Sequence, residues 1–327
     1  MGKKIAVYAI CKNEEKFVRR FLESMKEADE VTVLDTGSED GTVEILKALG
    51  ARVFRETVSP WRFDKARNRA LSYVSENMDI CVSADLDEYF LPGWRKNLEN
   101  AWTDKTRRAL FKYIWSFGEN GAEGTVLTLD KIHARHGYIW KYPVHEAVFP
   151  EDGKRENAEE CVYAEGVVLC HAPDPQKSRA QYLPLLETAV LENPADARCL
   201  HYLGREYMYK GMWEKCIQTL QAHLLLPGSL WKEERSASCR YMARAYRALG
   251  NSNQAECMYY AAISQAPELR EAYFELCGLF IKEGKITGAK FMAECALKIE
   301  KRPASYMSEE SAWNKEAEAF LKGVLSL

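Results

Sequence analysis

Regular alternation of short apolar runs with segments of helical periodicity is the feature of the first ninety residues that most restricts the possible fold. Aliphatic and β-branched residues form runs of strand length, and between these runs apolar residues recur every three or four positions, as on one face of a helix. Strands are predicted at 5–10, 31–34, 52–58 and 79–84, and helices at 17–25 (capped by Asn13), 38–49 and 64–74. Because right-handed crossovers join such units, they predict an α/β fold with a parallel sheet and helices on both faces.

Polar side chains follow each predicted strand. The loops read "CKNEE" after the first strand, "DTGSEDGT" after the second, "SPWRFDKARN" after the third and "DLDE" after the fourth. In parallel α/β sheets, ligands bind beyond the carboxyl ends of the strands. Four polar loops at one edge of one sheet therefore predict an active site at that edge.

Three carboxylates, Asp85, Asp87 and Glu88, lie within four residues after the fourth strand. Like charges at this spacing repel one another unless a cation lies among them. In an extended segment, residues i and i+2 point the same way, so Asp85 and Asp87 present two oxygen ligands to one face. Oxygen ligands suit Mg²⁺ or Mn²⁺, and Mg²⁺ completes its shell with water and substrate phosphates. The pattern predicts a divalent metal that holds a phosphorylated substrate.

Residues 100–175 contain further strand-like runs with glycine-rich turns between them. The runs at 109–115, 125–133 and 167–171 predict an extension of the sheet, with loops that form the acceptor side of the site. Within "YPVHEAVF" and "VVLCHAPDP", the side chains of His145, Glu146 and His171 lie in apolar sequence. These three residues are therefore candidates for the site.

From about residue 179 the sequence becomes helical and repeats. Gly211, Gly250 and Gly284 mark turns, and each is preceded by an aromatic residue at four positions and followed by a small residue at five. Twelve positions after the glycines come His223, Ala262 and Ala296. The segment resembles three tetratricopeptide repeats (TPRs), and the amphipathic tail at 308–325 is expected to cap the solenoid. The predicted domains are an α/β catalytic domain at 1–178 and an all-α repeat domain at 179–327.

The composition argues against several classes of protein. The chain has 327 residues, 47% of them apolar, and a net charge of −3, so it has no general attraction to nucleic acid or anionic membranes. No apolar stretch has the length of a membrane span, and the short run at 5–10 is typical of a first strand rather than a signal peptide. The ten cysteines are dispersed, as in reduced cytosolic proteins. We expect a cytoplasmic protein without a membrane span.

The order of "AICKNEE", "VLDTGSEDGT", "KARNRAL" and "SADLDE" resembles the nucleotide-binding half of a GT-A type glycosyltransferase of family 2, over about residues 4–90 and more weakly to about 175. The resemblance implies a Rossmann-like domain and a UDP-sugar donor. The residues that it implies for nucleotide-sugar binding are Lys12, Glu14, Asp35, Arg67, Asp85 and His145. It also implies that Asp85 and Asp87 bind Mn²⁺ or Mg²⁺, with His171 as a further ligand or diphosphate contact.

The resemblance implies a single inverting displacement. The cation neutralises charge on the leaving UDP, and a general base deprotonates the acceptor. Glu146 is the first candidate for the base, Glu88 and Asp174 are its rivals, and His145 would orient Glu146 or replace His171. The expected sugar is glucose or N-acetylglucosamine.

The repeats suggest the acceptor, because such solenoids bind peptides or pack against another copy. The layout is similar to peptide S-glycosyltransferases that resemble the sublancin-modifying enzyme, so a peptide or protein acceptor is predicted, and a homodimer through the repeats is an option. Cell-envelope polysaccharide or a lipid-linked sugar remains an alternative acceptor. A non-catalytic repeat protein with a degenerate GT-A domain is a second alternative, although its metal and nucleotide positions are filled. A nucleotidyltransferase is disfavoured, because the loop "CKNEEK" is acidic and lacks glycine.

Overall fold

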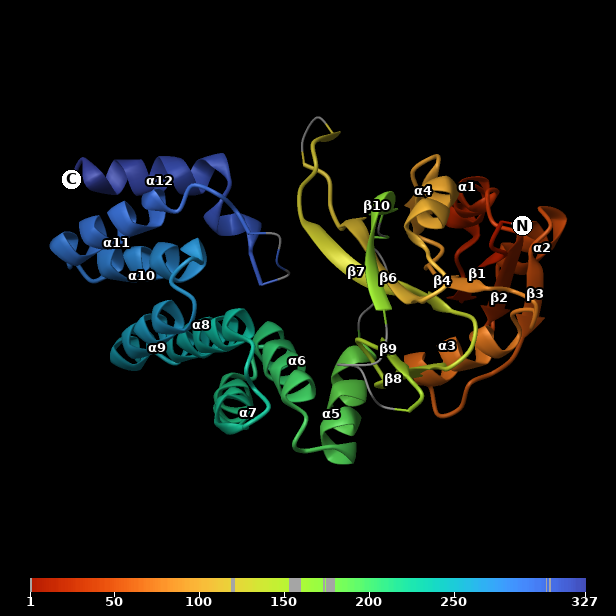
Figure 1. The fold of residues 1–327 in the computed structure, drawn as a ribbon. Helices are drawn as coiled ribbons and strands as arrows, with labels where there is room; N and C mark the ends of the chain where they lie inside the picture. The colour runs from red at the N-terminus through yellow and green to blue at the C-terminus, as the bar shows by residue number, and fades with distance from the viewer. Residues whose placement is uncertain are drawn as a thin grey trace. The chain divides into compact units, whose positions relative to one another are not determined.

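The computed structural model describes residues 2–118, 121–152, 160–172, 174, 180–303, 305 and 307–327. The chain forms two compact units, residues 1–178 and 179–327. In Figure 1 the first unit contains the sheets with their covering helices, and the second contains helices alone.

Four parallel strands form one half of the main sheet, in the order β3-β2-β1-β4. They are β1 (Ile5–Cys11), β2 (Glu30–Asp35), β3 (Arg52–Arg55) and β4 (Ile80–Ser83). Every residue of β1 is buried, because the strand has a neighbour on each side and helices cover the sheet. Cys11 lies beside Asp35 in the register, so the loops after β1 and β2 leave the sheet at one edge. The predicted parallel sheet is confirmed.

Helices cover both faces of this sheet. They are α1 (Glu15–Met25), α2 (Thr42–Ala48), α3 (Phe63–Ser72) and α4 (Trp94–Ala101). The apolar residues predicted for the first helix form its buried face, which includes Phe17, Phe21 and Met25. Figure 1 shows α1 and α4 on one side of the strands and α3 on the other, as the right-handed crossovers require.

The other half of the sheet is mixed and continues the order as β4-β7-β6-β10-β5. Its strands are β5 (Glu88–Phe90), β6 (Thr106–Ile114), β7 (Val126–Ala134) and β10 (Glu160–His171), and a separate hairpin pairs β8 (Tyr138–Lys141) with β9 (Ala147–Pro150). β7 runs antiparallel to both β4 and β6. β10 pairs with β5 so that His171 lies opposite Glu88. The predicted extension is confirmed, and this last pairing returns the end of β10 to the segment after β4.

The cap predicted for the first helix is wrong. The helix begins after Glu14, and its cap makes no side-chain hydrogen bond. Asn13 instead accepts a hydrogen bond from the backbone N–H of Glu39, with its Oδ1 2.8 Å from the nitrogen. Asn13 therefore joins the loops after β1 and β2 and does not cap α1.

Two further boundaries differ from their predictions. α2 begins at Thr42 and not at 38, because the carboxylates of Asp35 and Asp40 bind backbone N–H groups of the intervening loop and compete with the helix for them. β3 ends at Arg55 and not at 58. Arg55 pairs with Asp35, the last residue of β2, so β3 has no strand to pair with beyond this point.

The second unit consists of antiparallel helices. They are α5 (Tyr182–Glu192), α6 (Ala197–Tyr209), α7 (Trp213–Leu225), α8 (Lys232–Ala248), α9 (Ser252–Gln265), α10 (Arg270–Lys282), α11 (Ile286–Lys298) and α12 (Lys315–Leu325), with a 3-10 turn at Glu310–Ala312. Gly211, Gly250 and Gly284 lie in the turns within three helix pairs, at φ of 69°, 75° and 71°. Glycine suits these positions because a side chain would strain the backbone there. The predicted TPR-like solenoid is confirmed.

Small residues allow the helices of each pair to approach closely. A Cβ atom at Gly204 of α6 would lie 2.3 Å from the side chain of Leu220 on α7. The small residues predicted five positions after each turn glycine are fully buried: Cys216, Ala255 and Ala289. α12 contacts α11, and its buried residues include Leu321 and Val324.

The buried side chain of Arg240 links α8, α10 and the segment before α12 through ion pairs. Arg240 is fully buried and lies 3.2 Å from carboxylate oxygens of both Glu275 and Glu309. Arg244 lies 2.5 Å from the Glu309 carboxylate. Burial opposes ionisation of Glu309, but the two arginines hold its pKa below the ordinary value. The network therefore contributes more to stability at neutral pH than in acid, where Glu309 is protonated.

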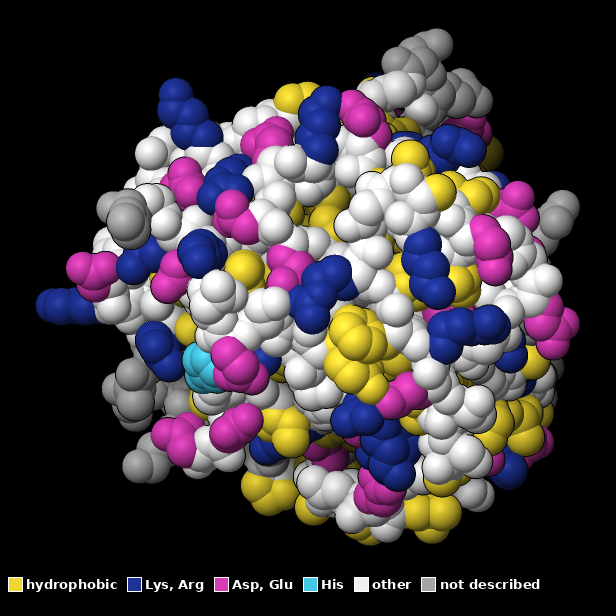
Figure 2. All heavy atoms as spheres, turned by 90° about the vertical axis from the view of Figure 1, so that its right-hand side faces the viewer, with side chains coloured by type: hydrophobic (Ala, Val, Ile, Leu, Met, Phe, Trp, Pro, Cys, Tyr) yellow, Lys and Arg dark blue, Asp and Glu magenta, His cyan; other side chains and the backbone are white. Residues whose placement is uncertain are grey.

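Charged side chains are mixed in sign on the face drawn in Figure 2. Lysine and arginine side chains alternate there with aspartate and glutamate, and no broad basic area is visible. This face offers no surface suited to a nucleic-acid backbone. Within the described ranges, no helix has both the length and the apolar character needed to cross a membrane.

Candidate active site

The predicted site residues come from separate segments that meet at the carboxyl edge of the parallel strands. Asp85 and Asp87 lie in the turn after β4, and Glu88 is the first residue of β5. Arg67 comes from α3, and Glu146 comes from the loop between β8 and β9.

Arg67 is the central cation of the site. Its guanidinium is almost fully buried and donates through Nε to Glu146 (2.6 Å) and through NH2 to both oxygens of Asp85 (2.8 and 3.1 Å). The remaining nitrogen donates to Ser83 at 3.1 Å, and the ring of Trp140 lies 5.1 Å below the guanidinium carbon. Burial opposes this charge, but Asp85 and Glu146 raise the pKa of Arg67 above its ordinary value. Arg67 thus fixes two acidic side chains from distant segments.

Glu88 is buried below the turn and holds it in place. Its Oε2 accepts the backbone N–H of Asp85 at 2.8 Å, and its Oε1 accepts the hydroxyl of Tyr113 at 2.7 Å and the ammonium of Lys131 at 3.3 Å. Burial raises the pKa of Glu88, Lys131 opposes the shift and Asp85 adds to it. Because three donors hold the carboxylate of Glu88 and only 2% of its side chain is exposed, Glu88 fixes the position of the turn.

Asp87 and His171 form the second acidic part of the site. Both are buried, and Nε2 of His171 lies 3.6 Å from Oδ2 of Asp87. That separation is too long for a hydrogen bond, but both atoms can lie about 2.1 Å from one cation. The other ring nitrogen of His171 lies 3.3 Å from the carbonyl oxygen of Trp115, which orients the imidazole.

The net charge of the site favours the binding of a divalent cation. Arg67 and Lys131 pair with the carboxylates of Asp85, Glu88 and Glu146, and a fourth carboxylate, Asp87, lies in the same turn as Asp85; these six residues form the charge cluster. With all of them ionised, the cluster has a net charge of −2, which is costly at a partly buried site. Two carboxylates with one imidazole are a donor set that fits Mn²⁺, because Mn²⁺ accepts oxygen ligands and imidazole suits transition metals.

The loop between β8 and β9 delivers Glu146 to this cluster. Tyr142 and His145 have φ of 78° and 52°, a left-handed conformation that is uncommon outside glycine and turns the loop sharply. The side chain of Glu146 is 12% exposed. Asp174, the rival candidate for the base, forms an ion pair with Lys16 of α1, with its Oδ2 2.5 Å from Nζ.

The residues predicted to bind the nucleoside lie after β1 and β2. Lys12 is exposed, whereas Glu14 is buried at the start of α1 and donates its backbone N–H to Thr42. Asp35 is fully buried, and its carboxylate accepts the N–H of Ser38 (3.1 Å) and Nε of Arg55 (3.0 Å). The structure thus places Asp35 inside its own loop, and its contact with a nucleotide stays a prediction.

Three residues of the site were missed by the sequence reasoning. Lys131 and Tyr113 come from β7 and β6, where they continue ordinary strand patterns, although a lysine within an apolar strand was a usable signal. Trp115 follows β6, is 40% exposed and stacks on His171 with 4.3 Å between ring centroids. Its exposed ring lies on the side of the cluster formed by the mixed half of the sheet.

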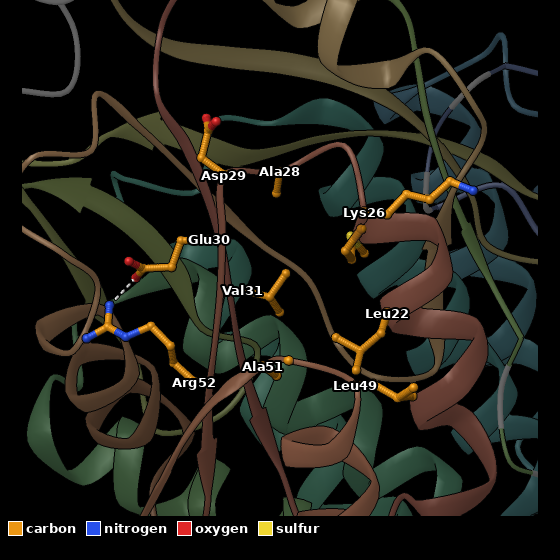
Figure 3. A pocket seen from close by; sticks show the side chains of 11 residues that line it. Leu22, Lys26, Ala28, Asp29, Glu30, Val31, Leu49, Ala51 and Arg52 are labelled. Carbon is orange, nitrogen blue, oxygen red and sulfur yellow. Dashed lines mark ion pairs between the residues drawn. The ribbon is translucent and has the colours of Figure 1, made fainter.

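A pocket of about 330 Å³ lies elsewhere in the same unit. Figure 3 shows Leu22 of α1 facing Val31 of β2, with an ion pair between Glu30 and Arg52 on one side. Glu30 and Arg52 begin β2 and β3, so the pocket lies at the amino edge of the strands, opposite the acidic cluster. The pocket is therefore not part of the candidate site.

Residues 6–150 match the family described as glycosyl transferase family 2. The lipopolysaccharide core biosynthesis glycosyltransferase LpsC of Rhizobium meliloti is 28% identical over 158 residues, which are 45% of this chain and 57% of that protein. An uncharacterized glycosyltransferase of Rickettsia typhi is 48% identical over 60 residues, 18% of this chain and 20% of that protein. The chain thus matches between a fifth and somewhat more than half of the length of these relatives.

Solved structures resemble each unit only loosely. Glucosyl-3-phosphoglycerate synthase from Mycobacterium tuberculosis, in complex with Mn²⁺, UDP and glucosyl-3-phosphoglycerate, matches with 27% identity and a TM-score of 0.28, over 35% of this chain and 45% of that one. The MamA structure matches with 16% identity and a TM-score of 0.33, over 44% of this chain and 82% of that one.

Proposed function

We propose that this chain, whose residues 6–150 form a glycosyl transferase family 2 domain, transfers a hexose from a UDP-sugar to an acceptor with the help of a divalent cation. The observation that carries the proposal is the approach of His171 to Asp87, in the same turn as Asp85, at a site whose carboxylates outnumber its cations. Asp85, Asp87 and His171 would hold the cation, and the imidazole favours Mn²⁺ over Mg²⁺. When bound, the cation supplies neutralisation of the charge that develops on the diphosphate leaving group.

Glu146 is the best placed of the candidate bases. It accepts from Arg67 through Oε1, which leaves Oε2 as the oxygen that can take the acceptor proton. Glu88 is less suited, because three donors hold it below the turn. Asp174 is less suited because Lys16 pairs with it. We assign Glu146 the role of base in an inverting displacement and Glu88 a positioning role.

The donor would lie between the first two loops and the acidic turn. We retain Lys12, Glu14 and Asp35 as donor-binding residues, and His145 as a residue that orients Glu146. For Asp35 to contact the nucleoside, its loop would have to exchange a bond to Ser38 or Arg55 for one to the ligand. Arg67 acts through Asp85 and Glu146 rather than by reaching the diphosphate itself.

A saccharide is the acceptor that we favour. The relative named for lipopolysaccharide core biosynthesis supports it, and so does the exposed ring of Trp115 beside His171, because the C–H face of a pyranose packs on an aromatic ring. A peptide or protein acceptor is the second candidate, supported by the helical repeats of residues 179–327. A homodimer through these repeats stays a prediction for a solution mass measurement.

A cytoplasmic location is part of the proposal. All ten cysteines are free thiols, as expected in a reducing compartment.

The proposal is tested by UDP release from a panel of UDP-sugars with Mn²⁺, with Mg²⁺ and with EDTA. Release should require the metal, and Asp87→Asn should lower the rate at least about a hundredfold, because one of the metal ligands loses its charge. Asp104→Asn is the matched control, since Asp104 is 97% exposed and pairs only at the surface with Lys3. An absence of UDP release with every donor and metal would favour the non-catalytic repeat protein.

A further inference from the structure

A second group of ligand-type side chains lies inside the helical unit. His201 of α6, His223 of α7 and Glu234 of α8 are buried, and each offers a donor atom within 4.8 Å of the other two. No residue of this group takes part in the proposed transfer reaction. The group joins three consecutive helices, which contact one another in pairs.

His223 occupies a position where the following helix pairs have a small residue. The following helix pairs place Ala262 and Ala296 at the corresponding position, and both alanines are fully buried. The first pair instead buries an imidazole there, which costs free energy unless the ring nitrogens find partners. The substitution of a histidine for a small residue therefore calls for a physical reason at this site.

The hydrogen bonds around His223 determine where the protons lie. An ionised Glu234 accepts only, so we assign the proton to Nε2 of His223, which lies 3.2 Å from Oε1 of Glu234 and 2.9 Å from the hydroxyl oxygen of Ser229. Nδ1 of His223 then accepts the hydroxyl of Ser238 at 3.1 Å, and the oxygen of Ser238 accepts Nδ1–H of His201 at 2.8 Å. Nε2 of His201 is left as a lone pair that is buried and without a hydrogen-bond partner. Such an orphaned acceptor is unusual and indicates a missing partner.

We propose that His201, His223 and Glu234 form a zinc site that ties the first helix pair of the repeat domain to α8. Two imidazoles and a carboxylate are a typical donor set for Zn²⁺. His201 would bind through Nε2, the nitrogen that Ser238 leaves unpaired. His223 would also bind through Nε2, and its proton would move to Nδ1, where it points at Ser238. Ser238 then accepts from both rings, the supporting role that metal-bound histidines require.

The geometry needs only a small adjustment to close around an ion. Donor atoms of a tetrahedral zinc site lie about 3.4 Å apart, given bonds of about 2.0–2.2 Å. One ligand atom of each residue, a ring nitrogen or a carboxylate oxygen, lies within 4.8 Å of the other two, so the largest of these separations would shrink by up to about 1.4 Å, which side-chain rotation can supply. Ser229, whose hydroxyl lies 2.9 Å from Nε2 of His223, stands next to the position of a fourth ligand or a bound water.

The experiment measures zinc in the full chain, in the Asp87→Asn background. This background prevents the acidic cluster of the sheet edge from being counted, so the result is independent of the proposed function. The protein is stripped with EDTA, dialysed against Zn²⁺, desalted and assayed by mass spectrometry of the metal. About one equivalent of zinc should remain, and it should raise the melting temperature. Co²⁺ in its place should give the visible absorption of a tetrahedral ion.

Two variants remove the proposed site in different ways. His223→Ala installs the residue that the other repeats use, and Glu234→Gln keeps the shape of the side chain while removing its charge. Both should reduce retained zinc to below about a tenth of an equivalent and abolish the rise in melting temperature. His136→Ala is the control, because His136 is 60% exposed in the other unit, and it should change nothing.

Two results would overturn the proposal. If the stripped protein takes up no zinc and shows no cobalt absorption, the three residues form a hydrogen-bond network alone. If zinc binds but both variants retain it, the ion lies elsewhere. Circular dichroism of each variant separates loss of the site from loss of the fold, and a folded Glu234→Gln variant suffices for the decision.

Discussion

Replacement of Arg67 by alanine is the perturbation that most directly tests the architecture of the acidic site. Arg67 is the one described side chain that bonds to both Asp85 and Glu146, and it is almost fully buried. Arg67→Ala would leave these two carboxylates, with Glu88 below them, without their main counter-charge. The variant should therefore lose both stability and the alignment of the proposed metal ligand and base.

The magnitude follows from burial. Removal of one partner from a buried ion pair typically costs about 3–5 kcal/mol. Asp85 is 32% exposed, so water screens its share, and Lys131 remains 3.5 Å from it. We therefore expect the free energy of unfolding to fall by about 2–4 kcal/mol. A loss of about 3 kcal/mol lowers the melting temperature of a domain of this size by roughly 6–12 °C. The loss should be greatest at neutral or alkaline pH and shrink in acid, because burial raises the pKa of Glu88 and its protonation relieves part of the repulsion.

The assay is thermal unfolding followed by tryptophan fluorescence, together with UDP release at the same pH values. Arg69→Ala is the matched control, because Arg69 lies on the same helix and pairs with Glu56, but its side chain is 51% exposed. Such a surface pair contributes about 0–1 kcal/mol. If the two variants prove equally stable at pH 8, or if the loss at Arg67 does not depend on pH, the account of Arg67 as the central cation is refuted.

Three further predictions concern the base and the repeat domain. Glu146→Gln should lower transfer by about 10²–10⁴-fold and leave UDP-sugar affinity unchanged, measured by calorimetry; equal rates would remove Glu146 as the base. Gly204→Ala should destabilise the repeats by about 1–3 kcal/mol, because its methyl group would lie 2.3 Å from a leucine of α7. In contrast, the methyl group of Gly278→Ala would meet no atom within 4 Å, so this variant should stabilise α10 by up to about 1 kcal/mol. A reversed order in urea unfolding would contradict the packing. Arg240 lowers the pKa of Glu309 in the folded state. The stabilisation from this ion pair is therefore present above the pKa of Glu309 in the unfolded chain and is lost as pH falls through its folded-state pKa. Glu309→Gln should make the free energy of unfolding less dependent on pH in this acidic range.

The position of the site was predictable because it depends on local patterns. Alternation of strand and helix assigns the elements, and the handedness of crossovers then brings the loops after parallel strands to one edge. Asp85 and Asp87 follow from this reasoning, since a pair of carboxylates after a buried strand needs only the direction of that strand. The turns at Gly211, Gly250 and Gly284 were predictable for the same reason, because their repeat spacing is visible along the chain.

The partners within the site were not predictable in this way. Lys131 reaches Glu88 only because β7 enters the sheet between β4 and β6 in one register, and His171 reaches Asp87 only because β10 pairs with β5. Asp35 shows the converse, because its residue type suggests a ligand contact while the fold turns its carboxylate toward its own loop.

The amino-acid sequence by itself therefore determined the kinds of element, their order and the edge where the chemistry lies. These features depend on periodicity and on interactions between near neighbours in the chain. The tertiary structure decided which charges neutralise which, and which nitrogen in the repeats is left without a partner. Those outcomes depend on distances between residues far apart in sequence, and a shift of one residue in strand register or a fraction of a helical turn would change them.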